Sequence, residues 1–512
     1  MNLGRTLAIA LSGLDGTPVE VETFVSSGLP RFTITGLPDA ACAQAPERVR
    51  AALSMGGVTM PPQRITVNLS PASLPKLGSG FDLPIAVALL RAMGVLAAPD
   101  CERVAHLGEL GLDGSLRAVP GVLPAVLAAA REGITDVVVP SANAREASLV
   151  DGIRVHHAPT LGELVQRYRA YEGRGLPDQE LPDAAQAPDA PVPDLGDVVG
   201  QQEARRALEL AAAGGHHLFL LGPPGSGKTM LAERMVSVLP PLGTRQALEV
   251  LAVASLAGRI EGTPRLSPVP PFVAPHHSAS AAAMVGGGSG LIRPGAISLA
   301  HQGLLFLDEA PEFRSSVLQS LRQPLESGQV VVSRARQTVR FPAGFQLVMA
   351  ANPCPCGQAV GKGTSCVCTP LQRRTYLSRL SGPLMDRVDL QVVVPAVTRA
   401  ALAHGGGESS AVVAERVLQA RAAQGRRWGE QVPGGLNVLV PGALLRSAPW
   451  RLPPAVTAGL DRALDRGLLT LRGYDRVLRV AWTCADLAGR DVPTADDLGG
   501  ALALRQQQGV AA

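Results

Sequence analysis

The feature that most constrains this chain is a glycine-rich loop set between an apolar run and a helix. Residues 222–229 read Gly-Pro-Pro-Gly-Ser-Gly-Lys-Thr, which matches the pattern GxxxxGK[ST]. The apolar run Leu218–Leu221 precedes the loop, and a helix opens at Met230. A glycine turn with a purely structural role would seldom have both neighbours. The pattern therefore predicts a P-loop nucleotide-binding α/β domain with a parallel sheet.

The chemistry of this loop gives its residues distinct tasks. Glycines let backbone N–H groups approach phosphate oxygens at the N-terminus of a helix. Lys228 is expected to reach the β and γ phosphates, and Thr229 to ligate Mg²⁺. ATP and Mg²⁺ are therefore the expected cofactors. The expected nucleotide-binding residues are Gly222, Pro223, Pro224, Gly225, Ser226, Gly227, Lys228 and Thr229.

Two further apolar runs end in polar residues. Leu304–Leu307 is followed by Asp308 and Glu309. Because ligands bind at the carboxyl edge of a parallel sheet, we expect Asp308 to hold Mg²⁺ and Glu309 to polarise the attacking water. A solvated strand end is the alternative for this acidic pair. The run Phe345–Ala351 ends at Asn352, which we expect to orient the water or sense the γ-phosphate, although a lone Asn is usually a turn residue.

Two arginines beyond these strands are candidates for contact with phosphate. Arg387 suggests an arginine presented at a subunit face to the nucleotide of a neighbour, where it would stabilise charge in the transition state. A surface ion pair with Asp389 is the alternative. Arg472 is the expected sensor on a helical lid that closes over ATP, with Arg476 in reserve and a solvated helix charge as the alternative. The expected catalytic set is Lys228, Glu309, Asn352 and Arg387.

Four of the seven cysteines lie in one short segment, as two Cys-x-Cys pairs formed by Cys354, Cys356, Cys366 and Cys368. Four thiolates at this spacing can reach one tetrahedral Zn²⁺, with reduced free cysteines or a redox pair as the alternatives. An odd cysteine number and such clustering favour a reducing compartment over a secreted disulfide framework. No run approaches the roughly 18 apolar residues of a membrane-spanning helix, and no signal peptide is evident. A cytoplasmic protein is expected.

Two strand-like runs within residues 329–341 predict a hairpin with Arg334 and Arg336 at its tip. If subunits form a ring, these arginines would point into the pore and bind a phosphate backbone in a salt-dependent way. A plain solvated hairpin is the alternative. The formal net charge of +4 permits nucleic acid without demanding it, so these local clusters decide. They indicate DNA as a partner.

The length of 512 residues exceeds what one core supports, so several domains are expected. Alternation over Val19–Leu37 and Ile65–Leu69 predicts strands, and residues 40–55 read as a helix. Residues 172–193 are rich in Pro, Ala and acidic residues, which is a linker composition. The expected boundaries are 1–171 for an α/β domain, 172–193 for the linker, 194–402 for an ATPase core, 403–432 for a linker and helix, and 433–512 for a C-terminal helical lid.

Several longer motifs resemble those of the magnesium-chelatase-like AAA+ family, and within it the YifB/ComM competence-protein group. The likeness extends over nearly the whole chain. It implies a ring-forming, hexameric ATPase with residues 274–290 as its helix-2 insert and 329–341 as its pre-sensor-1 hairpin. In ComM-type proteins it implies DNA branch migration during natural transformation. The most specific stretches are Ala274–Ser280, Val285–Gly288, Gly303–Phe313, Ala351–Gly357 and Leu377–Leu384.

The first domain resembles the protease domain of Lon in Pro75–Gly80 and in residues 108–134. This likeness puts Gly80 where the protease has its nucleophilic Ser, and Leu123 and Ala125 where its Lys should fall. Without that dyad, peptide hydrolysis lacks its nucleophile and base. We therefore expect a Lon-protease-like domain that is not an active protease and serves DNA binding or assembly.

The leading hypothesis is an ATP-hydrolysing ring motor that acts on DNA in a helicase-like manner, as a homo-oligomer. The alternative is a magnesium-chelatase-like or chaperone-like ATPase that remodels a protein partner. Hydrolysis stimulated by DNA would favour the first, and hydrolysis stimulated by a partner but indifferent to DNA would favour the second.

Overall fold

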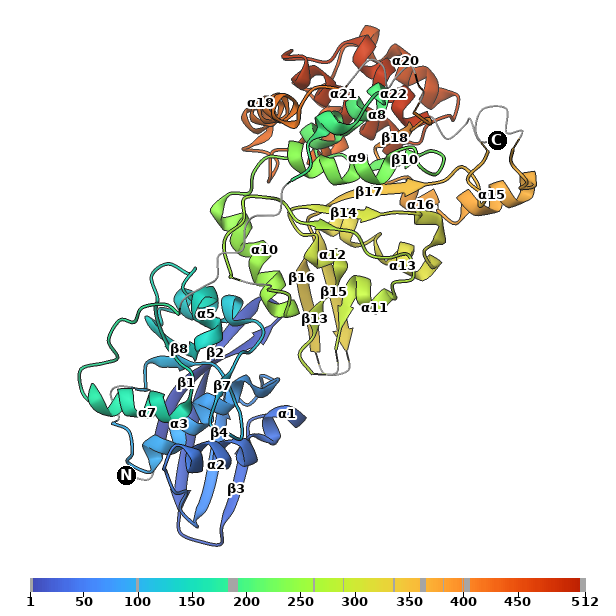
Figure 1. Ribbon diagram of the computed structural model, residues 1–512. Helices are drawn as coiled ribbons and strands as arrows, with labels where there is room; N and C mark the ends of the chain where they lie inside the picture. The colour runs from blue at the N-terminus through green and yellow to red at the C-terminus, as the bar shows by residue number, and fades with distance from the viewer. Residues whose placement is uncertain are drawn as a thin grey trace.

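The computed structural model describes residues 3–97, 101–182, 192–260, 263–288, 290–334, 337–359, 365–380, 382–397, 399 and 406–506. Figure 1 shows three parts: an α/β part near the N-terminus, a central part around a second sheet, and a helical part formed by the C-terminal residues. The two large sheets are separate. The predicted α/β class with a helical C-terminal region is confirmed.

The N-terminal part is built on a seven-stranded mixed sheet. In spatial order its strands are β3 (Arg31–Thr35), β4 (Arg64–Ser70), β2 (Asp15–Ser26), β1 (Leu3–Ser12), β5 (Val104–His106), β8 (Asp136–Pro140) and β9 (Arg154–Ala158). The pairs β1–β2 and β2–β4 are antiparallel, whereas the others are parallel. A short antiparallel pair, β6 (Glu109–Leu110) and β7 (Leu116–Arg117), lies apart from this sheet.

Helix α3 (Asp82–Ala92) is buried along its whole length and packs on β1 and β2. A Cβ at Gly4 would lie 2.1 Å from the carbonyl oxygen of Ala88, so the strand approaches this helix closely. The predicted helix over residues 40–55 is interrupted at Gln44, because Pro46 in the following first turn has no N–H to extend the earlier ladder. The other helices are α1 (Ala40–Ala43), α2 (Ala45–Met55), η1 (Ser79–Phe81), α5 (Val122–Arg131), η2 (Ser141–Asn143), α6 (Ala144–Ala147) and α7 (Leu161–Ala170).

The central part is built on a five-stranded parallel sheet. Its strands, in spatial order, are β11 (Phe272–Val273), β14 (Leu304–Leu307), β17 (Gln346–Ala351), β10 (Leu218–Leu221) and β18 (Leu390–Val393). Every residue of β14 and β17 is buried. Such continuous burial is expected for parallel strands covered on both faces. It explains why these strands read as unbroken apolar runs.

The helices of the central part connect these strands. They are η3 (Leu195–Asp197), α8 (Gln202–Gly214), α9 (Lys228–Met235), η4 (Val236–Val238), α10 (Thr244–Ala257), α11 (Ala281–Val285), α12 (Ala296–Leu299), η5 (Ala310–Glu312), α13 (Ser315–Ser320), α14 (Pro324–Ser327), α15 (Pro370–Ser378) and α16 (Gly382–Met385). Two hairpins leave the sheet, β12 (Gly286–Gly287) with β13 (Arg293–Pro294) and β15 (Gln329–Arg334) with β16 (Gln337–Pro342). The predicted hairpin over residues 329–341 is thus confirmed, and Figure 1 shows β13, β15 and β16 extending away from the helical part.

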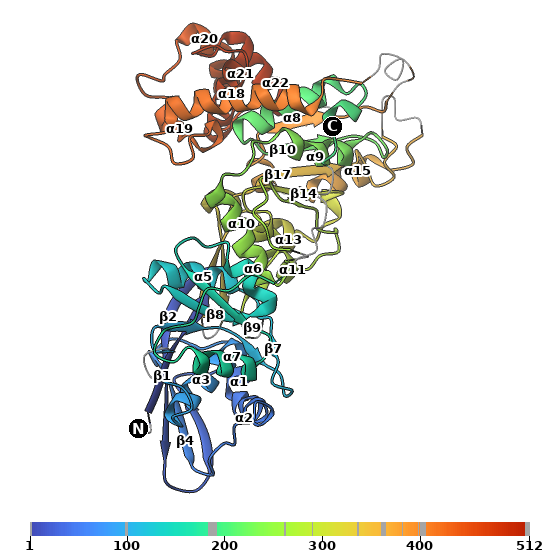
Figure 2. The same ribbon diagram turned by 60° about the vertical axis from the view of Figure 1, so that its left-hand side comes forward.

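The C-terminal part consists of α18 (Ser410–Trp428), η6 (Asn437–Leu439), α19 (Gly442–Leu445), α20 (Pro454–Asp465), α21 (Leu471–Leu487) and α22 (Ala495–Gln506). Three tryptophans pack together in its core, with the Trp428 ring centroid 4.6 Å from Trp450 and 5.6 Å from Trp482. Helices α18 and α21 both contact α8, and Figure 2 shows α18 running beside α8. This packing attaches the helical part to the central sheet. Among the described residues, no helix is both long and apolar enough to cross a bilayer.

The N-terminal part contacts the central part through α10, which packs on α5. The Ser255 hydroxyl donates to the buried carboxylate of Glu146, and the Gly121 N–H donates to the Ser255 carbonyl at 3.2 Å. Ala252 of the same helix belongs to the apolar core that contains Ile9. Polar and apolar contacts therefore both join these two parts.

Candidate nucleotide-hydrolysis site

The carboxyl edge of the central sheet gathers most of the predicted site residues. Leu221 pairs with Ala351, and Leu307 pairs with Met349, so β10, β14 and β17 end close together. The residues that follow these three strands are Gly222, Asp308, Glu309 and Asn352. Their juxtaposition agrees with the sequence analysis, while their catalytic roles stay predictions.

The P-loop runs from β10 into α9 and requires glycine at several positions. A Cβ at Gly222 would lie 2.2 Å from the Val394 carbonyl oxygen, and Gly225 and Gly227 have φ angles of 74° and 91°. Side chains fit neither the close approach nor the left-handed backbone. Ser226 is 1% exposed, and its hydroxyl has no hydrogen-bond partner in the described part of the chain. A buried hydroxyl left unpaired beside bare backbone fits a site that receives phosphate oxygens.

Lys228 is the buried cation of this loop. Its ammonium donates to the carbonyl oxygens of Gly222 and Pro223, both at 2.8 Å, and to Asn352 Oδ1 at 3.1 Å. Burial lowers the pKa of Lys228, and the nearby Asp308 carboxylate opposes this shift. The positive charge is therefore held between the P-loop and the end of β17.

Thr229 and the acidic pair bring side-chain oxygen atoms together at this edge. The Thr229 hydroxyl donates to Asp308 Oδ2 at 2.6 Å, and hydroxyl and carboxylate oxygens are ligands that Mg²⁺ accepts. Glu309 has a φ of 50°, a left-handed conformation that is uncommon for a non-glycine residue and is found at functional sites. Its Oε2 lies 3.2 Å from His277 Nδ1. The carboxylate is half-exposed, as a group that meets water must be.

Asn352 is held from two sides. Its side-chain oxygen accepts from Lys228, and its backbone N–H donates to the hydroxyl of Tyr376 on α15. Tyr376 is buried, and burial together with the Glu312 carboxylate raises its pKa to about 12. The P-loop, the Thr229–Asp308 pair and this fixed amide together fit a bound Mg²⁺–nucleotide.

Arg387 lies at the opposite, amino edge of the sheet, just before β18. It is 6% exposed, and its guanidinium donates to the Glu326 carboxylate and to the Pro383 carbonyl. The expected presentation on the surface is therefore not found in this chain. The alternative pair with Asp389 is not found either, because Asp389 bonds to Arg476 of the helical part.

Arg472 also lies at the amino edge. Its Nη2 is 3.7 Å from Glu326 Oε1, so Arg387 and Arg472 converge on one carboxylate. It lines a cavity together with Gly215 and His217, which precede β10, whereas the P-loop follows β10. Contrary to the prediction, Arg472 therefore does not lie over the nucleotide site of its own chain. The helical part is fixed to α8 at the other end of the strands.

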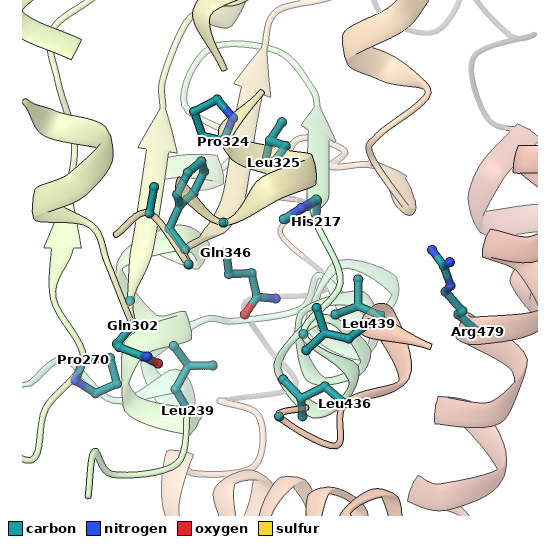
Figure 3. Close-up of a pocket in the computed structure, with 18 of the residues that line it drawn as sticks. His217, Leu239, Pro270, Gln302, Pro324, Leu325, Gln346, Leu436, Leu439 and Arg479 are labelled. Atoms are coloured by element: carbon teal, nitrogen blue, oxygen red, sulfur yellow. The ribbon is translucent and has the colours of Figure 1, made fainter. Parts of the chain in front are cut away.

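The cavity has a volume of about 1020 Å³, and its lining includes no residue of the P-loop. Figure 3 shows His217, Gln346 and Arg479 around it. Burial lowers the pKa of His217 to about 4. Its Nδ1 accepts from the Leu347 N–H at 3.0 Å, which requires the neutral ring. The amino edge therefore combines a large space, several arginines and a half-buried neutral histidine.

The four predicted metal ligands Cys354, Cys356, Cys366 and Cys368 come together directly after Asn352. Their sulfur atoms all lie within 4.8 Å of one another, and all four thiols are free of disulfides. A hydrogen bond from the Gln358 N–H lowers the pKa of Cys356 to about 6. This group is a candidate metal centre beside the P-loop.

The hairpin ends in an exposed Arg334, and Arg336 lies outside the described residues. Arg293 on β13 and Arg340 on β16 are also exposed. A Cβ at Gly287 would lie 3.1 Å from Arg334 Nη2, so the two hairpins touch near the Arg334 side chain. Exposed guanidinium groups therefore lie on both hairpins, close to where the hairpins touch.

In the N-terminal part, the positions considered for a protease dyad are apolar or bonded elsewhere. Leu123 and Ala125 are buried in an apolar core. The Ser79 hydroxyl donates to Glu109, and the fully buried Lys76 ammonium donates to the Pro71 carbonyl. These contacts support the expectation of an inactive domain, which stays a prediction.

Two polar residues with contacts at the edges of the sheet, Glu326 and Gln201, were missed from the sequence, whereas His277 lies in residues 274–290, which the resemblance assigned to the helix-2 insert. Glu326 holds the two arginines, His277 contacts Glu309, and Gln201 donates to the carbonyl oxygens of Ser226 and Pro395 at 3.1 and 2.6 Å. The signal for His277 was its place in this insert ahead of the acidic strand, although its contact with Glu309 was not predicted. Glu326 and Gln201 had none, because their partners are distant in the sequence.

A P-loop, an acidic strand end and an Asn-ended third strand on a parallel sheet, followed by a helical C-terminal region, define an AAA+-type ATPase. Three family models match three segments of the chain. The model described as magnesium chelatase, subunit ChlI, matches residues 194–402, and the model described as subunit ChlI of Mg-chelatase matches residues 21–143. The model of the ChlI C-terminal region of magnesium chelatase matches residues 407–505. The chain therefore belongs to the magnesium-chelatase-like family, in its YifB/ComM-type group.

Individual relatives place the chain within that family. It is 42% identical over 492 residues to the competence protein ComM of Haemophilus influenzae, covering 96% of this chain and 94% of that protein. It is 40% identical over 510 residues to the protein YifB of Escherichia coli, covering 99% and 97%. Likeness to the magnesium-chelatase 38 kDa subunit of Rhodobacter capsulatus is 28% over 192 residues, or 34% of this chain and 53% of that one.

Proposed function

We propose that this chain is an ATP-hydrolysing motor that assembles as a ring of identical copies, with six members, and acts on DNA. The observation that carries the proposal is the separation of the two halves of the hydrolysis machinery. Lys228, Thr229, Asp308, Glu309 and Asn352 meet at the carboxyl edge of the sheet. The candidate arginines lie at the amino edge, so a complete site needs the amino edge of a second copy.

Each residue at the carboxyl edge has a defined task in this proposal. Bound Mg²⁺–ATP supplies the phosphoryl group and the cation that neutralises its developing charge. Lys228 binds the β and γ phosphates, while Thr229 and Asp308 hold Mg²⁺. Glu309 accepts a proton from the attacking water, and Asn352 orients that water.

The amino edge of the neighbour supplies the remaining charge. Arg387 and Arg472 both contact the Glu326 carboxylate in the isolated chain. The terminal phosphate of a neighbour offers the same kind of acceptor, with more negative charge. We propose that the two guanidinium groups exchange Glu326 for that phosphate when copies assemble, and that they stabilise charge in the transition state as an arginine finger does.

DNA is favoured as the substrate by the two hairpins. Arg293, Arg334 and Arg340 are exposed, and none of the three has an acidic partner in the described part of the chain. Unpaired arginines bind the phosphate backbone without reading sequence. The likeness to a competence protein supports the same choice over a protein partner.

The test is the ATPase rate of the purified full chain, measured against protein concentration and with or without branched DNA. We expect the rate per chain to rise with concentration and to rise further with DNA. Lys228→Ala should lose about 100-fold or more, as removal of a preorganised charge at a reacting group does. A rate that depends on Lys228 but is indifferent to DNA would contradict the DNA proposal and favour a protein partner. A rate per chain that is constant down to the monomer would contradict shared sites.

A further inference from the structure

The sulfur atoms of Cys354, Cys356, Cys366 and Cys368 form a compact group with the dimensions of a metal site. Cys354 Sγ lies 3.4 Å from Cys356 Sγ and 3.6 Å from Cys366 Sγ. The distance between Cys356 Sγ and Cys366 Sγ is also 3.6 Å. Tetrahedral Zn²⁺ with bonds of about 2.3 Å sets its thiolate sulfurs about 3.8 Å apart. All four sulfurs lie within 4.8 Å of one another, so small shifts would complete such a tetrahedron.

The backbone around the cysteines is arranged to support thiolates. The N–H groups of Gln358 and Ala359 donate to the sulfurs of Cys356 and Cys354, and the N–H of Cys356 donates to Cys368. Hydrogen bonds of this kind orient metal ligands and offset part of their negative charge. Three bonds from one short turn are more than a reduced, solvated loop requires.

A redox pair accounts for less of this arrangement. A disulfide joins two sulfurs at about 2.0 Å, so it would not explain why the other two thiols lie in the same group. Here the Cys366 sulfur of the second pair lies 3.6 Å from both sulfurs of the first pair, those of Cys354 and Cys356, and Cys354 is fully buried. Four convergent soft ligands with no carboxylate or histidine among them favour Zn²⁺.

The turn that carries the first two cysteines packs directly on the P-loop. A Cβ at Gly357 would lie 2.5 and 2.6 Å from Cγ and Cδ of Pro224, and the φ of Gly357 is 75°. Only glycine permits this approach. The turn begins one residue after Pro353, which follows Asn352, so one short segment connects the sulfur group to two parts of the nucleotide site.

The second pair of cysteines leads into α15. Thr369 follows Cys368 and caps this helix, with its hydroxyl accepting from the Gln372 N–H at 3.2 Å. Tyr376 of the same helix accepts from the Asn352 N–H. A metal bound to all four sulfurs would therefore close the loop between β17 and α15 and fix Asn352 through both.

We propose that the four cysteines bind one Zn²⁺ per chain, and that this centre holds Asn352 and the P-loop in the geometry that nucleotide binding needs. The second half of this statement rests on the proposed ATPase function, whereas the first half does not. The centre acts through Asn352 and Pro224 and is a positioning element with no contact to the reacting atoms.

The first experiment measures the metal content of the full chain, freed of any affinity tag, by inductively coupled plasma mass spectrometry. One zinc per chain is expected. Titration of the native protein with a mercurial reagent should release that zinc, as read by a zinc-sensitive dye, in step with the loss of four thiols. Iron in place of zinc, or no metal above the buffer level, would overturn the proposal.

Matched variants locate the metal and test its coupling. The double variant Cys366→Ser with Cys368→Ser should lose the zinc, and Cys484→Ser, which changes a part-buried cysteine of α21, should retain it. Gly357→Ala should retain the zinc but bind a fluorescent ADP analogue about 10-fold more weakly, because supporting contacts of a site typically contribute 10-fold or more. Unchanged ADP binding in both the double variant and Gly357→Ala would refute the coupling.

The two proposals fail separately. Wild-type protein that holds one zinc but does not hydrolyse ATP would remove the proposed function and leave the metal centre. Protein that hydrolyses ATP without zinc would remove the metal centre and leave the function. If the double variant does not fold, the mercurial titration of the wild-type chain decides the metal question alone.

Discussion

The carboxyl and amino edges of the central sheet differ in how their charged groups are partnered. At the carboxyl edge Lys228 donates mainly to backbone oxygens, and the buried Ser226 hydroxyl has no partner in the described part of the chain. At the amino edge Arg387 and Arg476 are already bonded to Glu326 and Asp389. Only four to six residues of strand separate these edges. The first edge is prepared for a ligand, whereas the second must release a partner before it can act.

In the proposed assembly, this difference would separate nucleotide binding from hydrolysis. The Ser226 hydroxyl is unpaired and Lys228 bonds to neutral oxygens in the described part of the chain, so no ion pair has to break there before phosphate binds. The arginines that would complete the site are occupied until another acceptor replaces Glu326. Binding at one edge and hydrolysis between two edges are therefore separable steps, and substitutions can address each of them.

The largest effect is expected from Glu309→Gln at the carboxyl edge. The amide cannot accept the proton of the attacking water, so the ATPase rate should fall by about 100- to 10,000-fold. Nucleotide affinity should change little, because Lys228, Thr229 and Asp308 are intact. The check is a steady-state ATPase assay beside fluorescent ADP binding, and an active variant would show that Glu309 is not the base.

The comparison of edges is tested most directly by Arg472→Ala. Loss of one preorganised charge should reduce the rate by about 100-fold, with unchanged nucleotide affinity. Mixing Arg472→Ala with Glu309→Gln should restore part of the activity, since one kind of mixed interface has both edges intact. Mixtures that stay inactive, although the two variants co-assemble, would show that Arg472 does not serve a neighbour.

A smaller effect concerns stability at the amino edge. The pKa of His217 is lowered to about 4, so the unfolded chain binds a proton between about pH 6.5 and 4 that the folded chain does not. The stabilising contribution of neutral His217 is thus present above pH 6.5 and is lost as the pH falls toward 4, by at most about 1.4 kcal/mol per pH unit.

Urea denaturation at pH 7 and pH 5 measures this contribution. His217→Asn keeps an acceptor for the Leu347 N–H and removes the titration, so its free energy of unfolding should fall less than that of the wild type. Equal pH dependence in both proteins would contradict a neutral His217 in the folded chain. Since burial also lowers the pKa of His106, to about 3, the difference between the proteins is the relevant quantity.

The smallest effect is expected from Arg334→Ala on the hairpin. Removal of one phosphate contact should weaken DNA binding uniformly across sequences and reduce the slope of log affinity against log salt by about 1. Arg426→Ala, at an exposed position of α18, is the matched control. An identical salt slope in both variants would place the DNA contact elsewhere.

The carboxyl edge was predictable because each of its residues stands next to a recognisable local pattern. The P-loop follows an apolar strand, and Asp308, Glu309 and Asn352 follow two more. Parallel strands bring their carboxyl ends to one edge, so three local patterns suffice to assemble the edge. The cysteine group was predictable for a similar reason, because its two pairs lie within one loop.

The amino edge was not predictable in the same way. Arg472 was expected to cover the nucleotide of its own chain, and Arg387 to be exposed. Their actual positions depend on how α18 and α21 pack on α8, and on a carboxylate, Glu326, that is distant from both arginines in the sequence. Neither propensity nor spacing encodes such a docking direction.

The sequence by itself determined the class of fold, the P-loop chemistry, the hairpin and the candidate metal ligands, because glycine, apolar periodicity and ligand spacing are local properties of the chain. Only the tertiary structure decided which edge the arginines occupy, which carboxylate holds them, and that the cysteine turn packs on Pro224. These depend on contacts between residues far apart in the sequence, whose free energy is set by the burial of whole faces.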